Sequence, residues 1–197
     1  MDLFVTRISD FDIPDIDSIS LPIIQHLKTE EQERVEAKQY SMRGKTGYHS
    51  YNDLCYRNES WSSQLKSLLY MMLSDHAEKE EKSIAPLEVC KIECWGMIMR
   101  EGDSSSFHNH PGSMYSGVLY LEVPKLKDNE GQLVFVDPRS QIRSVRYSDQ
   151  LAFHRITPKK GDAYVFPYWL DHFVDPHFSN GERISLSFNL VDLPDYF

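Results

Sequence analysis

The second half of the sequence consists of short segments rich in β-branched and aromatic residues, with turn-forming residues between them. The segments are 89–99, 115–123, 132–137, 143–147, 151–156, 162–167, 171–178 and 183–191. Their composition predicts strands, and connectors such as KDNEG, TPKKGD and SNG predict turns. Eight strands with no helix between them indicate an antiparallel sandwich or barrel, and a jelly roll has eight. We therefore expect a mainly β fold, α+β by content, built around a jelly roll.

Residues 21–82 are helical in character instead. Thr29 and Gln32 form a capping-box pattern, which predicts that a helix begins at the charged run EEQERVEAKQY. Apolar residues recur at steps of three and four from Leu65 to Leu73, as in an amphipathic helix that covers another surface. The Gly- and Ser-containing stretch 43–55 between them is expected to be a loop. We predict one domain, 1–197, in which a layer of helices and loops (1–85) packs on one sheet of a jelly-roll core (86–197).

Charge and cysteine content limit the environment and the partners. The formal net charge of -9 argues against nucleic acid or an anionic membrane as a partner, because both require basic surfaces. No apolar run approaches the ~20 residues of a membrane span, and the N-terminus lacks a signal-peptide pattern. The three cysteines have neither disulfide nor zinc-site spacing, which indicates a reducing compartment. We expect a cytoplasmic protein, with a homodimer left open.

Two histidines one residue apart precede the predicted strand 115–123, in the sequence HNHPGSMYSGVLYLEV. In an extended chain, residues i and i+2 point to the same side, so the imidazoles of His108 and His110 can converge on one point. Imidazole is a common ligand of iron, zinc, copper and nickel. The pair is therefore a candidate for metal binding, with two surface histidines in a loop as the simpler alternative.

The stretch LDHFVDPHFSNGERISLSFNL contains Asn180-Gly181, a strong hairpin signal. A tight turn there predicts that Phe178 lies opposite Arg183 and that His172 lies opposite Asn189. Residues 183–191 alternate strictly between polar and apolar, so one face is expected to be buried in the core. In the predicted hairpin, the polar side chains of 183–191 point to the same face as His172. If the jelly roll holds a ligand between its sheets, this polar face lines the cavity.

A metal site inside the roll would explain both groups of polar residues. Such a site would combine His108 and His110 with His172. Arg183 would lie nearby, and its planar guanidinium suits a carboxylate because it forms two parallel hydrogen bonds. Ser185, two residues further along the same face, could donate another hydrogen bond to that carboxylate.

The segments HNHPGSMYSGVLYLEVP, DPR and PKKGDAYVFPYWLDHFVDPHFSNGERISLSFN resemble the Fe(II)/2-oxoglutarate-dependent oxygenases related to prolyl hydroxylases. The resemblance covers roughly residues 40 to 191. It implies a double-stranded β-helix, which is a jelly roll, with Fe(II) as the metal and 2-oxoglutarate as the cosubstrate. It also implies that His172 is the distal iron ligand and that Arg183 and Ser185 hold the far carboxylate of the cosubstrate. Tyr120 is implied as a further contact to the cosubstrate. We also place Asn189 among the residues expected to bind the cosubstrate.

The usual members of this superfamily have His-x-Asp or His-x-Glu where this chain has His108-Asn109-His110. Either His110 takes the place of the carboxylate, which gives three histidine ligands, or a carboxylate comes from elsewhere. Asp103 lies upstream in the same predicted loop and is the candidate. Asp171 is less suitable, because it neighbours His172 and should point to the opposite face of its strand.

The resemblance implies a dioxygenase that hydroxylates a substrate while 2-oxoglutarate is decarboxylated to succinate. The substrate, a small molecule or a peptide or protein, is not indicated, although His49 could contact it from a loop over the cavity mouth. The main alternative is a cupin-type isomerase or binding module that uses the same jelly roll and a metal without 2-oxoglutarate. The cupin motif is incomplete here, because its glutamate is absent after His110. A non-enzymatic jelly-roll binding domain is the third reading.

Overall fold

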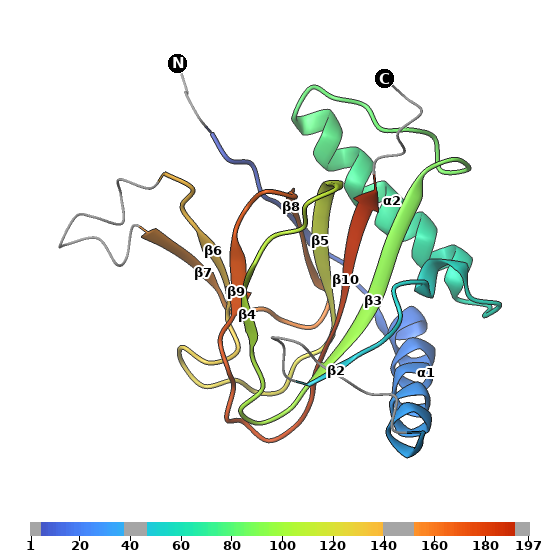
Figure 1. The fold of residues 1–197 in the computed structure, drawn as a ribbon, viewed down its shortest axis with the longest axis vertical. Helices are drawn as coiled ribbons and strands as arrows, with labels where there is room; N and C mark the ends of the chain where they lie inside the picture. The colour runs from blue at the N-terminus through green and yellow to red at the C-terminus, as the bar shows by residue number, and fades with distance from the viewer. Residues whose placement is uncertain (1–4, 38–46, 140–151, 192–197) are drawn as a thin grey trace.

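The computed structural model describes residues 5–37, 47–139 and 152–191. Two antiparallel sheets face each other and enclose the interior of the roll (Figure 1). The larger sheet has the strand order β1-β8-β5-β10-β3-β2. Its strands are β1 (Ser9–Asp12), β2 (Tyr48–His49), β3 (Lys91–Met99), β5 (Ser113–Glu122), β8 (Asp162–Pro167) and β10 (Arg183–Val191).

The smaller sheet has the order β4-β9-β6-β7. Its strands are β4 (Ser105–His108), β6 (Leu133–Val136), β7 (Phe153–Ile156) and β9 (His172–Val174). Two sheets with this alternating strand order form a double-stranded β-helix, so the predicted fold class is confirmed. Predicted strand 143–147 lies outside the described residues.

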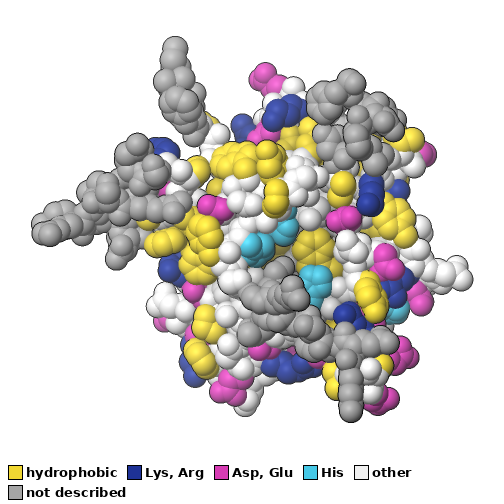
Figure 2. All heavy atoms as spheres, viewed as in Figure 1, with side chains coloured by type: hydrophobic (Ala, Val, Ile, Leu, Met, Phe, Trp, Pro, Cys, Tyr) yellow, Lys and Arg dark blue, Asp and Glu magenta, His cyan; other side chains and the backbone are white. Residues whose placement is uncertain are grey.

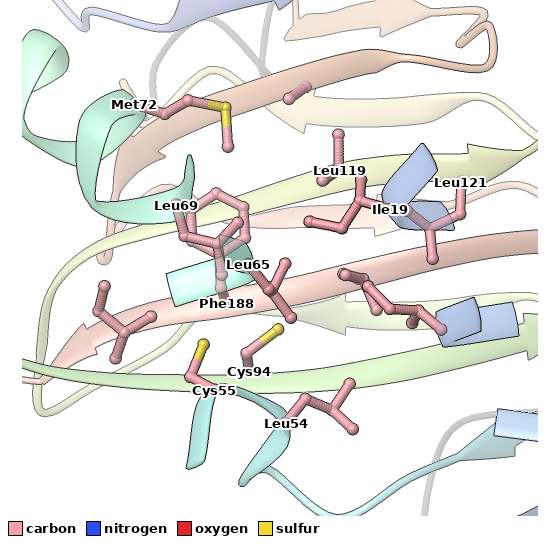
Figure 3. Close-up of a cluster of buried hydrophobic side chains, with 14 of the residues drawn as sticks. Ile19, Leu54, Cys55, Leu65, Leu69, Met72, Cys94, Leu119, Leu121 and Phe188 are labelled. Atoms are coloured by element: carbon pink, nitrogen blue, oxygen red, sulfur yellow. The ribbon is translucent and has the colours of Figure 1, made fainter. Parts of the chain in front are cut away.

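Both helices, α1 (Asp17–Glu36) and α2 (Ser62–Lys79), cover the outer face of the larger sheet (Figure 1). A short 3-10 helix, η1 (Leu54–Tyr56), joins this layer. Figure 3 shows side chains of α2, among them Leu65 and Leu69, directed at Phe188 on the sheet. The predicted helical layer on one sheet is therefore present. Among the described residues, no helix is long and apolar enough to cross a membrane.

The alternation in β10 divides the core into two parts. Ile184, Leu186, Phe188 and Leu190 belong to the cluster beneath the helices. The polar residues between them face the other sheet, and the cluster on that side includes Trp95, Met97 and Tyr120. The polar face of β10 therefore lines the interior of the roll, as its sequence pattern predicts.

The predicted hairpin between 171–178 and 183–191 is wrong. In the structure β10 pairs with β3 and β5, which occupy both of its edges, and Asn189 lies opposite Glu93 and Ser116. His172 instead lies in β9, opposite His108 on one side and Phe135 on the other. The Asn180-Gly181 turn therefore carries the chain from one sheet to the other, and Gly181 has a positive φ of 112° there.

The predicted helix start at Thr29 is also wrong. Helix α1 begins twelve residues earlier, at Asp17, and Thr29 lies inside it with its hydroxyl donating to the Gln25 carbonyl at 3.0 Å. A Ser or Thr hydroxyl can bond one turn back in a helix interior, so the capping pattern alone is not decisive. Three short strands, β1, β2 and β4, were not predicted, and β2 lies in the predicted loop 43–55.

Candidate metal centre

Strand pairing in the smaller sheet brings two of the predicted histidines together. His108 ends β4 and His172 begins β9, and the two are direct partners across these strands. His110 follows in the next turn, where its backbone N–H donates to the Tyr168 carbonyl at 3.0 Å. The three side chains therefore meet at one end of the smaller sheet, on its inner side.

Ligand atoms of His108, His110 and His172 all lie within 4.8 Å of one another. They are the only group of three or more His, Cys, Asp or Glu with this geometry in the described part of the chain. Nε2 of His110 lies 3.3 Å from Nε2 of His172. Two nitrogens that each bind one metal ion at about 2.1 Å are separated by about 3.0 Å when they subtend a right angle. The spacing fits shared coordination of a divalent metal.

Backbone carbonyls orient two of these rings. Nδ1 of His108 lies 2.6 Å from the Ser106 carbonyl oxygen, and Nδ1 of His172 lies 2.8 Å from that of Leu170. A carbonyl oxygen can only accept, so Nδ1 carries the proton in both rings. The lone pair is then on Nε2, as in metal-binding histidines whose other nitrogen is held by a carbonyl. The residues present fit a metal ion.

The structure does not bring Asp103 to the three histidines. Its carboxylate accepts from the backbone N–H of Arg100 at 2.8 Å, in the turn between β3 and β4. This turn closes at the far end of β4 from His108, so Asp103, the possible carboxylate substitute, lies away from the three histidines. Asp171 accepts from the amide of Asn109 at 2.9 Å and is likewise outside the histidine group.

Arg183 is buried in the roll, with 1% of its surface exposed. Its Nη2 donates to the hydroxyl of Tyr120 at 2.9 Å and its Nη1 lies 3.3 Å from the sulfur of Met99. Its Nε is buried without a hydrogen-bond partner in the described residues. No described carboxylate forms an ion pair with it. A buried charge without a counterion is costly, so this site favours an anionic ligand.

Tyr120 is completely buried beside this guanidinium. Burial raises the pKa of its phenol, although the positive charge of Arg183 opposes the shift. The phenol is therefore protonated at neutral pH. Because its oxygen accepts from Arg183, its own O–H remains available as a donor. Ser185 is also buried, with its hydroxyl on the same inner face of β10.

One cavity of about 40 Å³ is lined by both the arginine and the histidines. The residues that line it are Met97, Met99, Ser105, His108, His110, Gly117, Val118, Tyr120, Leu133, Phe166, His172, Val174, Arg183, Ser185 and Ser187.

Met97 and Met99 form a methionine wall of this cavity that was not predicted. They lie opposite Ser185 and Arg183 in the pairing of β3 with β10. The alternation of residues along the predicted strand 89–99 places them on one face, and this parity was the available signal. Asn189 does not line the cavity, and its amide nitrogen lies 3.5 Å from Nδ1 of His110.

The histidine end of the cavity is nearer to solvent than the arginine end. His108 and His110 are half-buried, whereas Arg183 and Ser185 are buried. Beside them, the ring of His49 stacks on Trp95, with centroids 5.5 Å apart, and Trp95 lies 5.9 Å from the ring of His110. Figure 2 shows histidine side chains gathered near the centre of one face, among hydrophobic groups. His49 therefore lies at the edge of the site, outside the cavity lining.

Comparison of the sequence with protein families gives one match. Residues 93–189, close to half of the chain, match a family described as "Putative 2OG-Fe(II) oxygenase". This range begins in β3, ends in β10 and includes all three histidines and Arg183. A search of curated proteins gives no significant match.

Solved structures of similar fold come from the same group of enzymes. A Pseudomonas putida prolyl-4-hydroxylase superposes with a TM-score of 0.67 at 16% identity, over 96% of this chain and 94% of the other. A Trichoplax adhaerens prolyl hydroxylase, in complex with a hypoxia inducible factor peptide fragment, gives 0.62 at 16% identity, over 94% and 83%. HygX from Streptomyces hygroscopicus, with nickel and 2-oxoglutarate bound, gives 0.59 at 12% identity, over 98% and 84%.

At these identities the likeness to the solved structures is one of fold, and the family match concerns the sequence itself. Both agree with the resemblance of the histidine and arginine segments, and neither favours the cupin alternative. The family match over residues 93–189 and the shared fold therefore indicate a 2OG-Fe(II) oxygenase, a hydroxylase-type enzyme.

Proposed function

We propose that this protein is an Fe(II)- and 2-oxoglutarate-dependent dioxygenase that hydroxylates a small molecule or a peptide and converts 2-oxoglutarate to succinate. The observation that carries the proposal is the buried guanidinium of Arg183, which has no anionic partner among the described residues and shares a cavity with three converging histidines. A dicarboxylate that also binds metal satisfies both ends of this cavity at once.

In this proposal, Arg183 binds the far carboxylate of 2-oxoglutarate through its two terminal nitrogens. Tyr120 holds the guanidinium in place and offers its O–H to the same carboxylate, and Ser185 supplies a further donor. A charge-assisted pair of this kind is strong in a buried site because water does not compete for the donors. The methionine wall excludes that water.

At the other end, Nε2 of His108, His110 and His172 would hold Fe(II). The group of three histidines replaces the two-histidine, one-carboxylate set that is typical of such oxygenases. The composition of this group supports His110 as the third ligand, because none of the carboxylates of the described residues belongs to it. When bound, Fe(II) and 2-oxoglutarate would supply the oxidising chemistry, in which 2-oxoglutarate loses carbon dioxide, one oxygen atom of O₂ enters succinate and the other enters the substrate.

Substrate would approach from the histidine end, where the cavity is closer to solvent. His49 and Trp95 form an aromatic edge there, which suits a flat or apolar group beside the metal. His49 is the proposed substrate contact. Proteins of similar fold include a prolyl hydroxylase in complex with a peptide fragment and a carbocyclase from nogalamycin biosynthesis, so the fold accommodates both classes of substrate.

The proposal is tested by titrating 2-oxoglutarate into the Fe(II)-loaded protein without oxygen and measuring its affinity by calorimetry. The matched ligand is 2-oxopentanoate, which keeps the metal-binding end of 2-oxoglutarate and lacks the far carboxylate. We expect 2-oxoglutarate to bind at least tenfold more tightly than 2-oxopentanoate, and this preference to disappear in Arg183→Met. Equal affinity for the two ligands in the wild type would overturn the role of Arg183. If the protein binds the metal but neither 2-oxoglutarate nor 2-oxopentanoate, the cupin-type alternative would be favoured.

A further inference from the structure

The third histidine of the candidate metal centre is oriented differently from the other two. Backbone carbonyls face Nδ1 of His108 and of His172. Nδ1 of His110 instead faces the side chain of Asn189, with the amide nitrogen 3.5 Å away. A backbone carbonyl can only accept a proton, whereas a side-chain amide offers an acceptor at one end and a donor at the other.

Asn189 is a buried residue in the middle of the larger sheet. Only 8% of its surface is exposed, and β10 is held at this point by β5 on one side and β3 on the other. Its Oδ1 is buried and has no hydrogen-bond partner among the described residues. Burial of an unpaired amide oxygen is unfavourable, so the group is expected to find a partner.

The orientation of the amide decides which nitrogen of His110 carries the proton. If Nδ2 points to the ring and donates to Nδ1, the ring proton must be on Nε2, which faces Nε2 of His172 at 3.3 Å. A protonated Nε2 cannot bind a metal. A half-turn of the amide exchanges its oxygen and nitrogen without changing its shape, so that Oδ1 accepts a proton from Nδ1 and Nε2 becomes bare.

We propose that Asn189 is the positioning residue for His110: its Oδ1 accepts from Nδ1–H and fixes the tautomer in which Nε2 can bind a metal. This inference rests on the proposed metal centre and adds a residue that does not itself touch the metal. Asn189 then does for His110 what the carbonyls of Ser106 and Leu170 do for the other two rings. Partners of this kind change metal affinity by about 10- to 100-fold when they are removed.

The tautomer can be measured directly on the metal-free full chain. Long-range ¹H–¹⁵N correlation spectra at pH 8 distinguish protonated from bare ring nitrogens, and the His110→Gln variant assigns the signals of His110. We expect a protonated Nδ1 and a bare Nε2 in His172→Ala, in which Nε2 of His110 no longer faces the bare Nε2 of His172 at 3.3 Å. Protonation on Nε2 instead would overturn the proposal, and this result does not depend on metal binding.

Metal affinity gives the second readout, with Co(II) as the probe in competition calorimetry. Asn189→Leu keeps the size of the side chain and removes its acceptor, so we expect Co(II) to bind about 10- to 100-fold more weakly. Asn189→Asp keeps an acceptor and loses the donor, so its affinity should stay within about threefold of the wild type or increase. An equal loss in both variants would show that the amide donates or only fills space, and no loss in Asn189→Leu would also overturn the proposal.

Gln132→Leu is the matched control, because it removes another buried amide, whose partner is Thr157 at 2.9 Å. We expect its Co(II) affinity to equal that of the wild type. A loss as large as that of Asn189→Leu would mean that lost stability explains both. If the wild type binds no Co(II) at all, the proposed metal centre itself fails, whereas wild-type binding that is unchanged in Asn189→Leu overturns the role of Asn189 alone.

Discussion

The hydroxyl of Tyr120 is the only polar side-chain oxygen that the described structure places on the guanidinium of Arg183. We therefore expect Tyr120→Phe to weaken 2-oxoglutarate binding about tenfold, since a hydrogen bond to a charged group contributes roughly 1.5 kcal/mol or more. Affinity is measured by anaerobic calorimetry with Fe(II) present. Tyr164→Phe is the control, because its ring is in the same inner cluster and its hydroxyl contacts Asp162. Equal affinity of Tyr120→Phe and wild type would contradict the role of the phenol.

His76 lies on the buried face of α2, fully buried, with Nδ1 2.8 Å from the hydroxyl of Ser9. Burial lowers its pKa, and the nearby carboxylate of Glu80 only partly opposes this. The unfolded chain therefore takes up a proton on this histidine at a higher pH than the folded protein does. The stability that neutral His76 contributes is complete above about pH 6.5, the ordinary value for histidine, and is lost as the pH falls below it.

We accordingly expect the free energy of unfolding to fall between pH 7 and pH 5 more steeply in the wild type than in His76→Gln. Urea denaturation at a series of pH values measures the two slopes. His154→Gln, at an exposed position of β7, is the control and should follow the wild type. Equal slopes for wild type and His76→Gln would show that His76 has the same pKa in the folded and the unfolded protein.

At the scale of elements, α1 lies close to the sheet because β3 has a glycine beneath it. A Cβ placed on Gly96 would lie 2.4 Å from both terminal carbons of Leu27, which is fully buried on α1. We expect Gly96→Ala to destabilise the protein by about 1–3 kcal/mol through overpacking. Leu27→Ala alone should cost about 2–5 kcal/mol, because it leaves a cavity.

The double variant Gly96→Ala/Leu27→Ala tests whether the two side chains share this space. Its loss in free energy of unfolding, measured by urea denaturation, should be smaller than the sum of the two single losses. Additive losses would mean that the added methyl group meets something other than Leu27.

Sequence patterns predicted most strands of the roll, because the alternation of polar and apolar residues indicates a strand with one buried face. The alternation in 183–191 correctly indicated one apolar and one polar inner face. It could not show which strands lie beside it, since pairing is a non-local property. The hairpin prediction assumed that strands adjacent in sequence pair, and the chain instead passes to the other sheet after β9.

The candidate site could be predicted in part for the same reason. Spacing within one segment placed His108 and His110 together, the polar face of the last strands added His172 and Arg183, and the resemblance to oxygenases added Tyr120. The position of Asp103 depends on the turn after β3, where its carboxylate accepts from a backbone N–H, and no sequence signal indicated that contact. The contact between Asn189 and His110 joins β10 to the turn after β4, so it too could be seen only in the folded chain.

At the scale of the whole molecule, the histidines come from the smaller sheet and its turns and the arginine from the larger one. A metal and a cosubstrate bound between them should therefore stabilise the folded protein. At a free concentration of 100 times the dissociation constant, each adds about 2.7 kcal/mol. For a chain of this size, this corresponds to an increase in Tm of roughly 5–10 °C.

This increase is measured by anaerobic thermal denaturation with Fe(II), with and without 2-oxoglutarate. The shift due to Fe(II) should disappear in His172→Ala, whereas Arg183→Met should lose only the part due to 2-oxoglutarate. An unchanged Fe(II) shift in His172→Ala would place the metal elsewhere.

The central claim is that one cavity holds the metal at its histidine end and 2-oxoglutarate across to Arg183. The most direct test adds Fe(II) and then 2-oxoglutarate to metal-free protein without oxygen and records the weak visible charge-transfer band of a 2-oxo acid chelated to iron. We predict a band in the wild type, no band in His172→Ala, and a band in Arg183→Met that requires at least tenfold more 2-oxoglutarate. One tightly bound iron that is lost in His172→Ala, with no band at any 2-oxoglutarate concentration in the wild type, would contradict the claim.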